Sequence, residues 1–99
     1  MNESQLEALG EGRYRLSGEL SIDTVPEVLR HAKHLFDGPG PVQVDLGGVT
    51  RADSAGVALL VDWRTEAQRR KQQIVFTQVP SQMLAIARIS GVAELLDLK

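Results

Sequence analysis

The sequence predicts an α/β fold in which a mixed sheet is covered by helices mainly on one face. Some short segments alternate polar and apolar residues, as a strand with one buried face does. Other segments repeat apolar residues at helical spacing. Along the chain these segments run as strands first, then helix, strand, helix, strand, helix. Because helices that connect parallel strands produce this alternation, we expect right-handed crossovers.

The composition indicates one ordinary globular domain. A length of 99 residues suits a single domain, expected to cover residues 1–99, and a hydrophobic fraction of 42% is enough for a core. The net charge of −2 argues against a nucleic-acid partner, since that affinity comes largely from neutralised phosphates. The sequence contains no cysteine, which excludes disulfides and cysteine-rich zinc sites.

The sequence shows no secretion signal and no membrane span. Residues 1–5 lack the basic and then apolar regions of a signal peptide. No run approaches the roughly 18 consecutive apolar residues of a spanning helix. We therefore expect a cytoplasmic chain without direct membrane insertion.

The first half of the chain predicts two strands and a helix. Residues 13–18 alternate as a strand, and a weaker strand is expected over residues 5–9. Thr24 and Glu27 have the spacing of a capping box, with Pro26 in the first turn, so a helix is expected to begin there. Its apolar stripe consists of Val25, Val28, Leu29, Ala32, Leu35 and Phe36.

The second half predicts the remaining elements. The segment 37–41, Asp-Gly-Pro-Gly-Pro, ends the first helix, and residues 42–46 form a strand that Gly47 and Gly48 close. Ser54 is expected to be the N-cap of a second helix that reaches the basic residues 69–71. Then follow a strand over 73–77, a helix that starts at Pro80-Ser81 and ends near Gly91, and a short helix over 92–96.

Enzyme chemistry finds little support in the sequence. His31 and His34 are three residues apart, but no further ligand at matching spacing completes a metal site, so a solvated helix face is expected. The segment 38–41 follows a helix and contains two prolines, unlike a phosphate-binding loop. Ser54 has no general base placed beside it by spacing. We therefore predict a protein that is not an enzyme and needs no cofactor or metal.

Arg64, Arg69, Arg70 and Lys71 form a basic cluster near the end of the second helix. Cations in a last helical turn are expected from the helix dipole alone. A contact with an acidic partner at the rim of an interface is compatible with that role.

The turn from Asp53 to Gly56 is the segment that a capping role does not fully explain. Ala55 and Gly56 leave the first helical turn without large side chains, so another protein's backbone could approach it closely. The N–H groups at a helix start also favour a phosphoryl group or a carboxylate.

At this turn the sequence resembles the STAS domain family. The resemblance rests on Val44-Asp45-Leu46, Val49, Asp53-Ser54-Ala55-Gly56, Val57 and Leu60, and upstream on Leu16-Ser17-Gly18-Glu19-Leu20. It covers nearly the whole chain. It implies a four- to five-stranded mixed sheet with about three to four helices packed mainly on one face, and a function exercised by binding another protein.

Within the family, the segments 53–63 and 84–92 are most similar to the free-standing STAS subunits of Mla-type phospholipid ABC transporters. This similarity implies a non-catalytic regulatory subunit that binds the transporter ATPase and, through it, the membrane permease. Such a subunit is cytoplasmic, lies at the inner membrane through its partner, and serves lipid asymmetry of the outer membrane in Gram-negative bacteria.

The alternative within the family is an anti-sigma-factor antagonist switched by phosphorylation of Ser54. The Gly-Glu-Leu-Asp pattern common in those antagonists has Ser21 in place of its aspartate here, and Asp23, two residues further on, is the candidate substitute. That departure tells against a kinase switch.

The partner-binding surface is predicted around the start and exposed side of the second helix. It comprises Asp53, Ser54, Ala55, Gly56, Ala58, Asp62 and Thr65. Leu59, Leu60 and Trp63 share the face of Gly56 and Ala67 and are expected in the core, with an interface anchor as the alternative for Trp63.

Overall fold

The sheet begins with a hairpin of two antiparallel strands, β1 (Gln5–Gly10) and β2 (Arg13–Leu20). The structure is a computed structural model that describes residues 5–98. The prediction about a signal peptide concerns residues 1–5, of which residues 1–4 lie outside this range; residue 99 lies outside it as well. Both predicted N-terminal strands are confirmed, although each extends beyond its predicted end.

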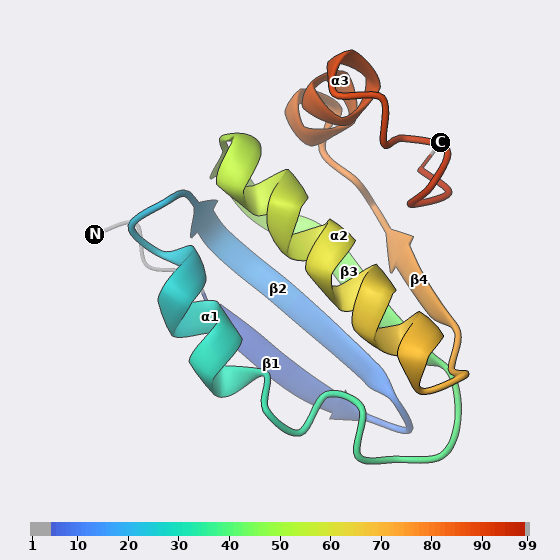
Figure 1. Cartoon of the computed structure of the whole chain (residues 1–99). Coiled ribbons are helices and arrows are strands. Elements are labelled where there is room, and N and C mark those ends of the chain that lie inside the picture. The colour runs from blue at the N-terminus through green and yellow to red at the C-terminus, as the bar shows by residue number, and fades with distance from the viewer. Residues whose placement is uncertain (1–4, 99) are drawn as a thin grey trace.

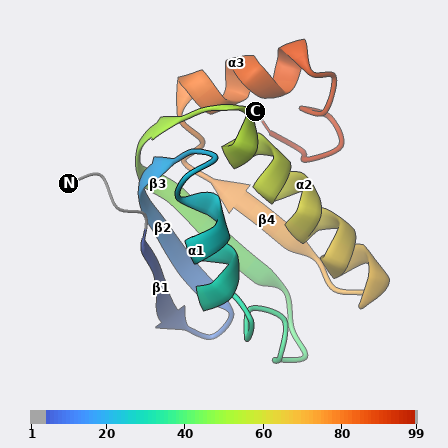
Figure 2. The same cartoon turned by 60° about the vertical axis from the view of Figure 1, so that its left-hand side comes forward.

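The sheet has the order β1-β2-β3-β4, and β3 (Val42–Ala52) and β4 (Ile74–Thr77) run parallel to β2. Three helices alternate with the strands: α1 (Val25–His31), α2 (Ser54–Arg69) and α3 (Ser81–Ile89). Helices α1 and α2 lie over the same face of the sheet, and α3 lies beyond the end of β4 (Figures 1 and 2). The predicted α/β fold with a mixed sheet is therefore confirmed.

The core lies between the sheet and the two helices that cover it. Alternate residues of the central strands point inward, and Leu16, Leu20, Val44 and Leu46 are fully buried. On the opposite face, Arg15 forms an ion pair with Asp45 across β2 and β3 at 3.6 Å. One sheet face is thus apolar and covered, while the other carries this ion pair and, on β4, the half-exposed Val75.

The inner face of α2 completes this core. Its buried residues are Gly56, Val57, Leu59, Leu60, Trp63 and Ala67. Trp63 is only 4% exposed, so the predicted core position is confirmed and the alternative of an interface anchor is wrong. Among residues 5–98, no helix is long and apolar enough to cross a bilayer.

The start of α1 was predicted correctly, but the predicted capping box does not form. The Thr24 side chain makes no cap hydrogen bond to the helix. Its hydroxyl instead donates to the Glu19 carbonyl at 2.7 Å and accepts from the Ser21 amide at 2.9 Å. Glu27 binds the side chains of Arg30 and His31 on its own helix. The Thr24 side chain, which the sequence pattern assigned to the helix cap, therefore stabilises the loop after β2 instead.

Helix α1 also ends earlier than its apolar stripe suggested. It stops at His31, and residues 32–36 continue as turns. Leu35 and Phe36 are nevertheless buried, so the stripe identified core residues without giving the length of the helix.

The prediction that Gly47 and Gly48 close the third strand is wrong, because β3 continues to Ala52. Gly48 lies against the neighbouring strand, where an added Cβ would be 2.7 Å from the Cβ of Ser17. The register of β2 against β3 shifts at this place, between Arg15 and Ser17. Glycine at position 48 thus permits a close approach of two strands.

The predicted helix over residues 92–96 is also wrong. Residues 93–97 form hydrogen-bonded turns, including a bond from the Leu96 amide to the Val92 carbonyl at 3.0 Å. Leu96 and Leu98 are buried, so this segment still packs on the core as expected.

Candidate functional site

Helix α2 begins directly after the last residue of extended backbone, Asp53. The Asp53 Oδ1 atom accepts a hydrogen bond from the Ala55 amide at 2.8 Å. Asp53 is therefore the N-cap, and the predicted cap at Ser54 is wrong by one residue, since Ser54 is already the first helical residue. An aspartate is favoured here because its negative charge also lies at the positive end of the helix dipole.

The same carboxylate connects the helix start to the loop after β2. Asp53 Oδ2 accepts a hydrogen bond from the Ile22 amide at 3.4 Å. Within that loop, the Asp23 amide donates to the Ser21 hydroxyl at 3.2 Å. The loop and the first turn of α2 are consequently held together as one surface.

Ser54 is exposed, and its hydroxyl makes no side-chain hydrogen bond to another residue of the range 5–98. Three further predicted residues, Ala58, Asp62 and Thr65, are exposed on the same helix. Their spacing of four, four and three residues from Ser54 onward places all four on one side of α2. We call these four residues the α2 stripe.

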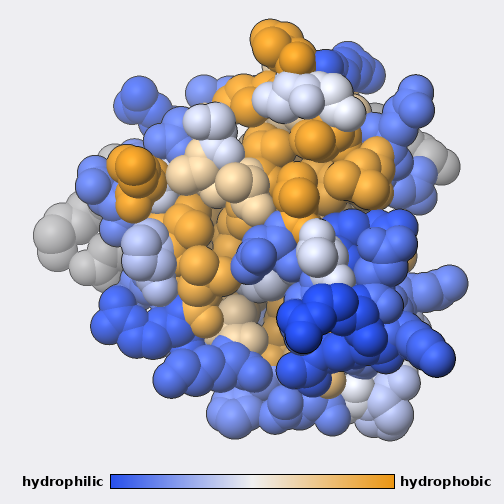
Figure 3. Space-filling view, in the orientation of Figure 1, coloured by the Kyte–Doolittle hydropathy of each residue, from blue (hydrophilic) through white to orange (hydrophobic). Residues whose placement is uncertain are grey.

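The ends of α2 differ in surface character. Figure 3 shows hydrophilic side chains around the C-terminal end of α2, and more apolar ones toward the end of the molecule where α2 begins.

The two hydroxyl groups of the stripe differ in their hydrogen bonding. The Thr65 hydroxyl donates to the Val61 carbonyl at 2.9 Å. The hydroxyl of Ser54 makes no such bond to residues 5–98. Of the two hydroxyl groups in the stripe, it is therefore the one that can donate to a partner.

Gly56 does not serve the predicted exposed turn, because it is buried on the inner side of α2. An added Cβ would lie 3.0 Å from the Cβ of Leu20 and 3.3 Å from the Cβ of Ala52. Gly56 therefore packs closely against β2 and β3 of the same chain and not against a partner. The expectation of an open glycine for a partner is thus corrected, and Ala55 is itself half-buried.

A shallow hollow of about 260 Å³ lies beside the capped turn. It is lined by Glu19, Leu20, Ser21, Ile22, Asp23, Arg51, Ala52 and Asp53. Three of these residues are acidic and one is an arginine, so the charge around the hollow is predominantly negative. Asp23, suggested by the sequence as a substitute for the missing aspartate at position 21, does line this hollow.

Sequence reasoning missed Ile22, whose side chain is 75% exposed. The residue lies in a loop, where no periodicity distinguishes an outward apolar side chain from an inward one. Its proximity to Asp53 depends on a contact across 31 positions of the chain, which local patterns do not reveal.

The histidines take part in local pairs on the surface. His31 Nε2 lies 3.0 Å from Glu27, and His34 Nδ1 lies 2.6 Å from Asp37. Both lie at or beyond the C-terminal end of α1, away from the start of α2 (Figure 1). Among residues 5–98, no cluster of three or more His, Cys, Asp or Glu side chains is arranged to hold a metal ion.

Much of the basic cluster is engaged within the molecule. Glu66 pairs with Arg69 at 2.9 Å and with Arg70 at 2.7 Å. The hydrogen bond from Arg70, helped by the charges of both arginines, holds the pKa of Glu66 below its ordinary value of 4.5, although desolvation opposes this. Arg70 also donates to the Phe36 carbonyl at 3.3 Å and lies over the Phe36 ring. These contacts agree with a structural role for the end of α2.

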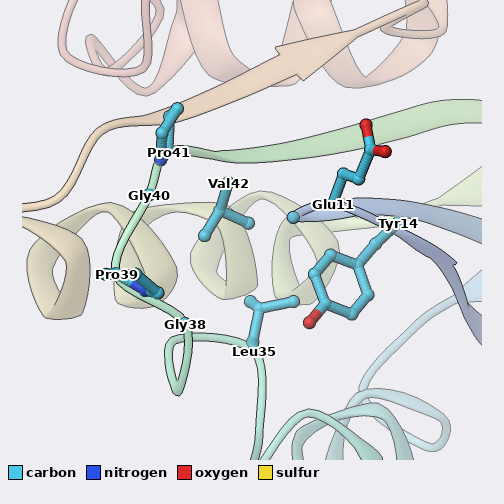
Figure 4. Close-up of a pocket in the computed structure, with 9 residues that line it drawn as sticks. Glu11, Tyr14, Leu35, Gly38, Pro39, Gly40, Pro41 and Val42 are labelled. Carbon is cyan, nitrogen blue, oxygen red and sulfur yellow. The ribbon is translucent and has the colours of Figure 1, made fainter.

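A second hollow, of about 400 Å³, lies at the other end of the sheet. Leu35, Val42 and the Tyr14 ring border it together with the loop 38–41 (Figure 4). Gln72 fixes that loop, because its Nε2 donates to the carbonyls of Gly38 at 2.7 Å and Gly40 at 3.0 Å. Glu11 is the one charged residue among those that line it, so no convergent set of reactive groups is present there.

Taken together, the fold and the capped turn define a STAS-type regulatory domain: a mixed sheet, helices on one face, and an exposed serine at the start of α2. Residues 5–97 match the family model described as "Mlab, STAS domain", and the chain belongs to this MlaB-like STAS family. None of the curated proteins compared with the chain matches it.

Proposed function

We propose that this chain is the STAS subunit of an Mla-type phospholipid ABC transporter, where it binds and regulates the ATPase subunit from the cytoplasmic side. The single observation that carries the proposal is the α2 stripe, an exposed and connected surface next to the capped turn in an MlaB-like domain. In this role the chain performs no chemistry. ATP hydrolysis belongs to the partner, and lipid movement to the membrane permease.

The side chains of the stripe suit a protein interface. Ser54 and Ala58 are small, so a partner helix or loop can approach the α2 backbone closely. The Ser54 hydroxyl can donate to a partner carbonyl, and Asp62 offers a charge near the middle of the helix. Because the underlying residues Leu59, Leu60 and Trp63 are buried in the core, the stripe is held on a rigid support.

A second function, the anti-sigma-factor antagonist, is favoured by one observation: Ser54 is exposed and therefore open to a kinase. Phosphorylation would add about −1.5 to −2 charges at pH 7. Those charges would lie next to Asp53, close to a hollow with an excess of carboxylates. This surrounding charge makes a phosphorylated state costlier here, and we place the transporter role first.

The test is a mild-detergent pull-down from native cells with tagged wild type, Ser54→Asp and Ala58→Arg. Gln73→Arg is the matched control, since Gln73 is exposed but lies after the end of α2, away from the stripe. Mass spectrometry identifies the bound proteins and the phosphorylation state of Ser54, and thermal melting checks that each variant folds.

The proposal expects an ABC ATPase with its permease to be recovered by wild type and by Gln73→Arg, and to be depleted with the two stripe variants. Full recovery with both stripe variants would place the interface elsewhere. A small kinase as the partner, with phosphate on Ser54, would replace the transporter role by the antagonist role.

A further inference from the structure

We infer that Ile22 is an apolar anchor of the same interface, and that it enters an apolar pocket on the partner whose rim carries Lys or Arg. This inference rests on the proposed function and adds a second element to it, the loop after β2. It assigns to the partner a specific chemistry that the α2 stripe alone does not define.

The first support is the exposure of Ile22. Its side chain is 75% exposed, and it lies in the short loop between β2 and α1. Residues that carry most of the energy of a protein interface are typically apolar or aromatic side chains inserted into partner pockets. Within the proposed interface, Ile22 is the large apolar side chain that projects furthest into solvent.

The second support is the rigidity of the loop that carries Ile22. The Thr24 hydroxyl bridges the Ser21 amide and the Glu19 carbonyl, and the Ile22 amide itself is held by Asp53. A side chain on a backbone that is already fixed loses little conformational entropy on binding. The loop is thus arranged to present Ile22 before a partner arrives.

The third support is the charge around Ile22. Glu19, Asp23 and Asp53 line the adjoining hollow, against the single cation Arg51. Charges at an interface rim steer association and select partners of opposite sign. The complementary surface is therefore an apolar pocket bordered by basic side chains.

The fourth support is continuity with the α2 stripe. Asp53 holds the Ile22 amide with one carboxylate oxygen and the Ala55 amide with the other. Ser54 lies between Asp53 and Ala55 in the chain, so the loop that carries Ile22 is attached directly beside the start of the stripe. Ile89 is more exposed, at 88%, but it lies at the last residue of α3, outside this connected surface.

The experiment measures binding of the purified chain to the ABC ATPase recovered with wild type, using titration at two salt concentrations. Ile22→Ser is expected to weaken binding by about 10- to 30-fold. Ile22→Leu should stay close to wild type, and Ile89→Ser is the matched control for removing an exposed isoleucine. Asp23→Arg should weaken binding and reduce the dependence of the affinity on salt concentration. Thermal melting of every variant checks the fold.

The outcomes separate this inference from the proposed function. If wild type binds the ATPase, Ala58→Arg abolishes binding and Ile22→Ser binds as wild type does, the role of Ile22 is overturned while the transporter role stands. Equal losses in Ile22→Ser and Ile89→Ser would also overturn it. If no ABC ATPase is recovered with wild type, both proposals fail together.

Discussion

The carboxylate of Asp53 caps helix α2 by accepting a hydrogen bond from the Ala55 amide at 2.8 Å. The preceding residue in the sheet, Ala52, is buried, and the following residue, Ser54, is exposed. One residue thus satisfies the helix start and leaves the next side chain free for another protein. Stability and recognition are divided between two adjacent positions.

This division predicts different effects of two alanine substitutions on stability. Asp53→Ala removes the cap and the bond to the Ile22 amide, so it should lower the free energy of unfolding by about 1–2 kcal/mol. Ser54→Ala should change it by less than about 0.5 kcal/mol. Urea denaturation followed by circular dichroism measures both.

Asp53→Asn is the control, because asparagine also caps helices and should retain most of the stability. If Ser54→Ala lowered the free energy of unfolding by more than Asp53→Ala does, Ser54 and not Asp53 would be the residue that caps α2.

Gly56→Ala is predicted to destabilise the fold although alanine is the better helix former by about 1 kcal/mol. The added methyl group would lie 3.0 Å from the Leu20 Cβ and 3.3 Å from the Ala52 Cβ. Both neighbours belong to paired strands, so they yield little, and overpacking of this kind costs about 1–3 kcal/mol. We expect a net loss of about 1 kcal/mol in chemical denaturation.

Gly40→Ala is the matched control, since no heavy atom lies within 4 Å of its added Cβ, and its stability should stay near that of wild type. A stabilised Gly56→Ala variant would mean that helix propensity outweighs packing at this position.

Gly48→Ala is predicted to act through Ser17 on the neighbouring strand. The two Cβ atoms would lie 2.7 Å apart, which forces the strands to move. A loss of about 2–3 kcal/mol is expected. Removing the opposing Cβ with Ser17→Gly should recover part of this loss in the double variant, because two residues in contact couple energetically.

The recovery is expected to be partial, since the new methyl group would still lie 3.3 Å from the Ser17 Cα. Strictly additive losses in the double-mutant cycle, measured by urea denaturation, would exclude this contact as the reason for glycine at position 48.

Local periodicity predicted most of the fold because burial repeats along a helix or strand. The inner face of α2 was foreseen from the spacing of Leu59, Leu60, Trp63 and Ala67, all of which are buried. The strands follow from alternation in the same way. The exposed positions Ala58, Asp62 and Thr65 were also foreseen, since they occupy the other side of that helix.

Contacts between distant segments explain what the sequence did not predict. Gly48 was interpreted as the end of a strand because its contact with Ser17 joins two segments that are far apart in the sequence, and local patterns do not reveal such a contact. Thr24 was assigned to a capping box, whereas the Glu19 carbonyl binds its hydroxyl. Ile22 escaped notice because its position beside Asp53 depends on the pairing of β2 with β3.

A last prediction concerns pH and the end of α2. Hydrogen bonding from Arg70 lowers the pKa of Glu66 in the folded chain relative to the unfolded chain. Between the two pKa values the unfolded state therefore binds more protons, so stability rises with pH there. The contribution is fully present above the ordinary value of 4.5 and is lost as the pH falls through the lower folded pKa.

The melting temperature of wild type should therefore be slightly higher than that of Glu66→Gln at about pH 7, and the difference should shrink toward about pH 3. The matched control is Glu94→Gln, at an exposed carboxylate outside this arginine pair, whose difference from wild type should change less over the same range. A gap between wild type and Glu66→Gln that stays constant, or widens on acidification, would show that the pairing with Arg70 does not stabilise the folded chain.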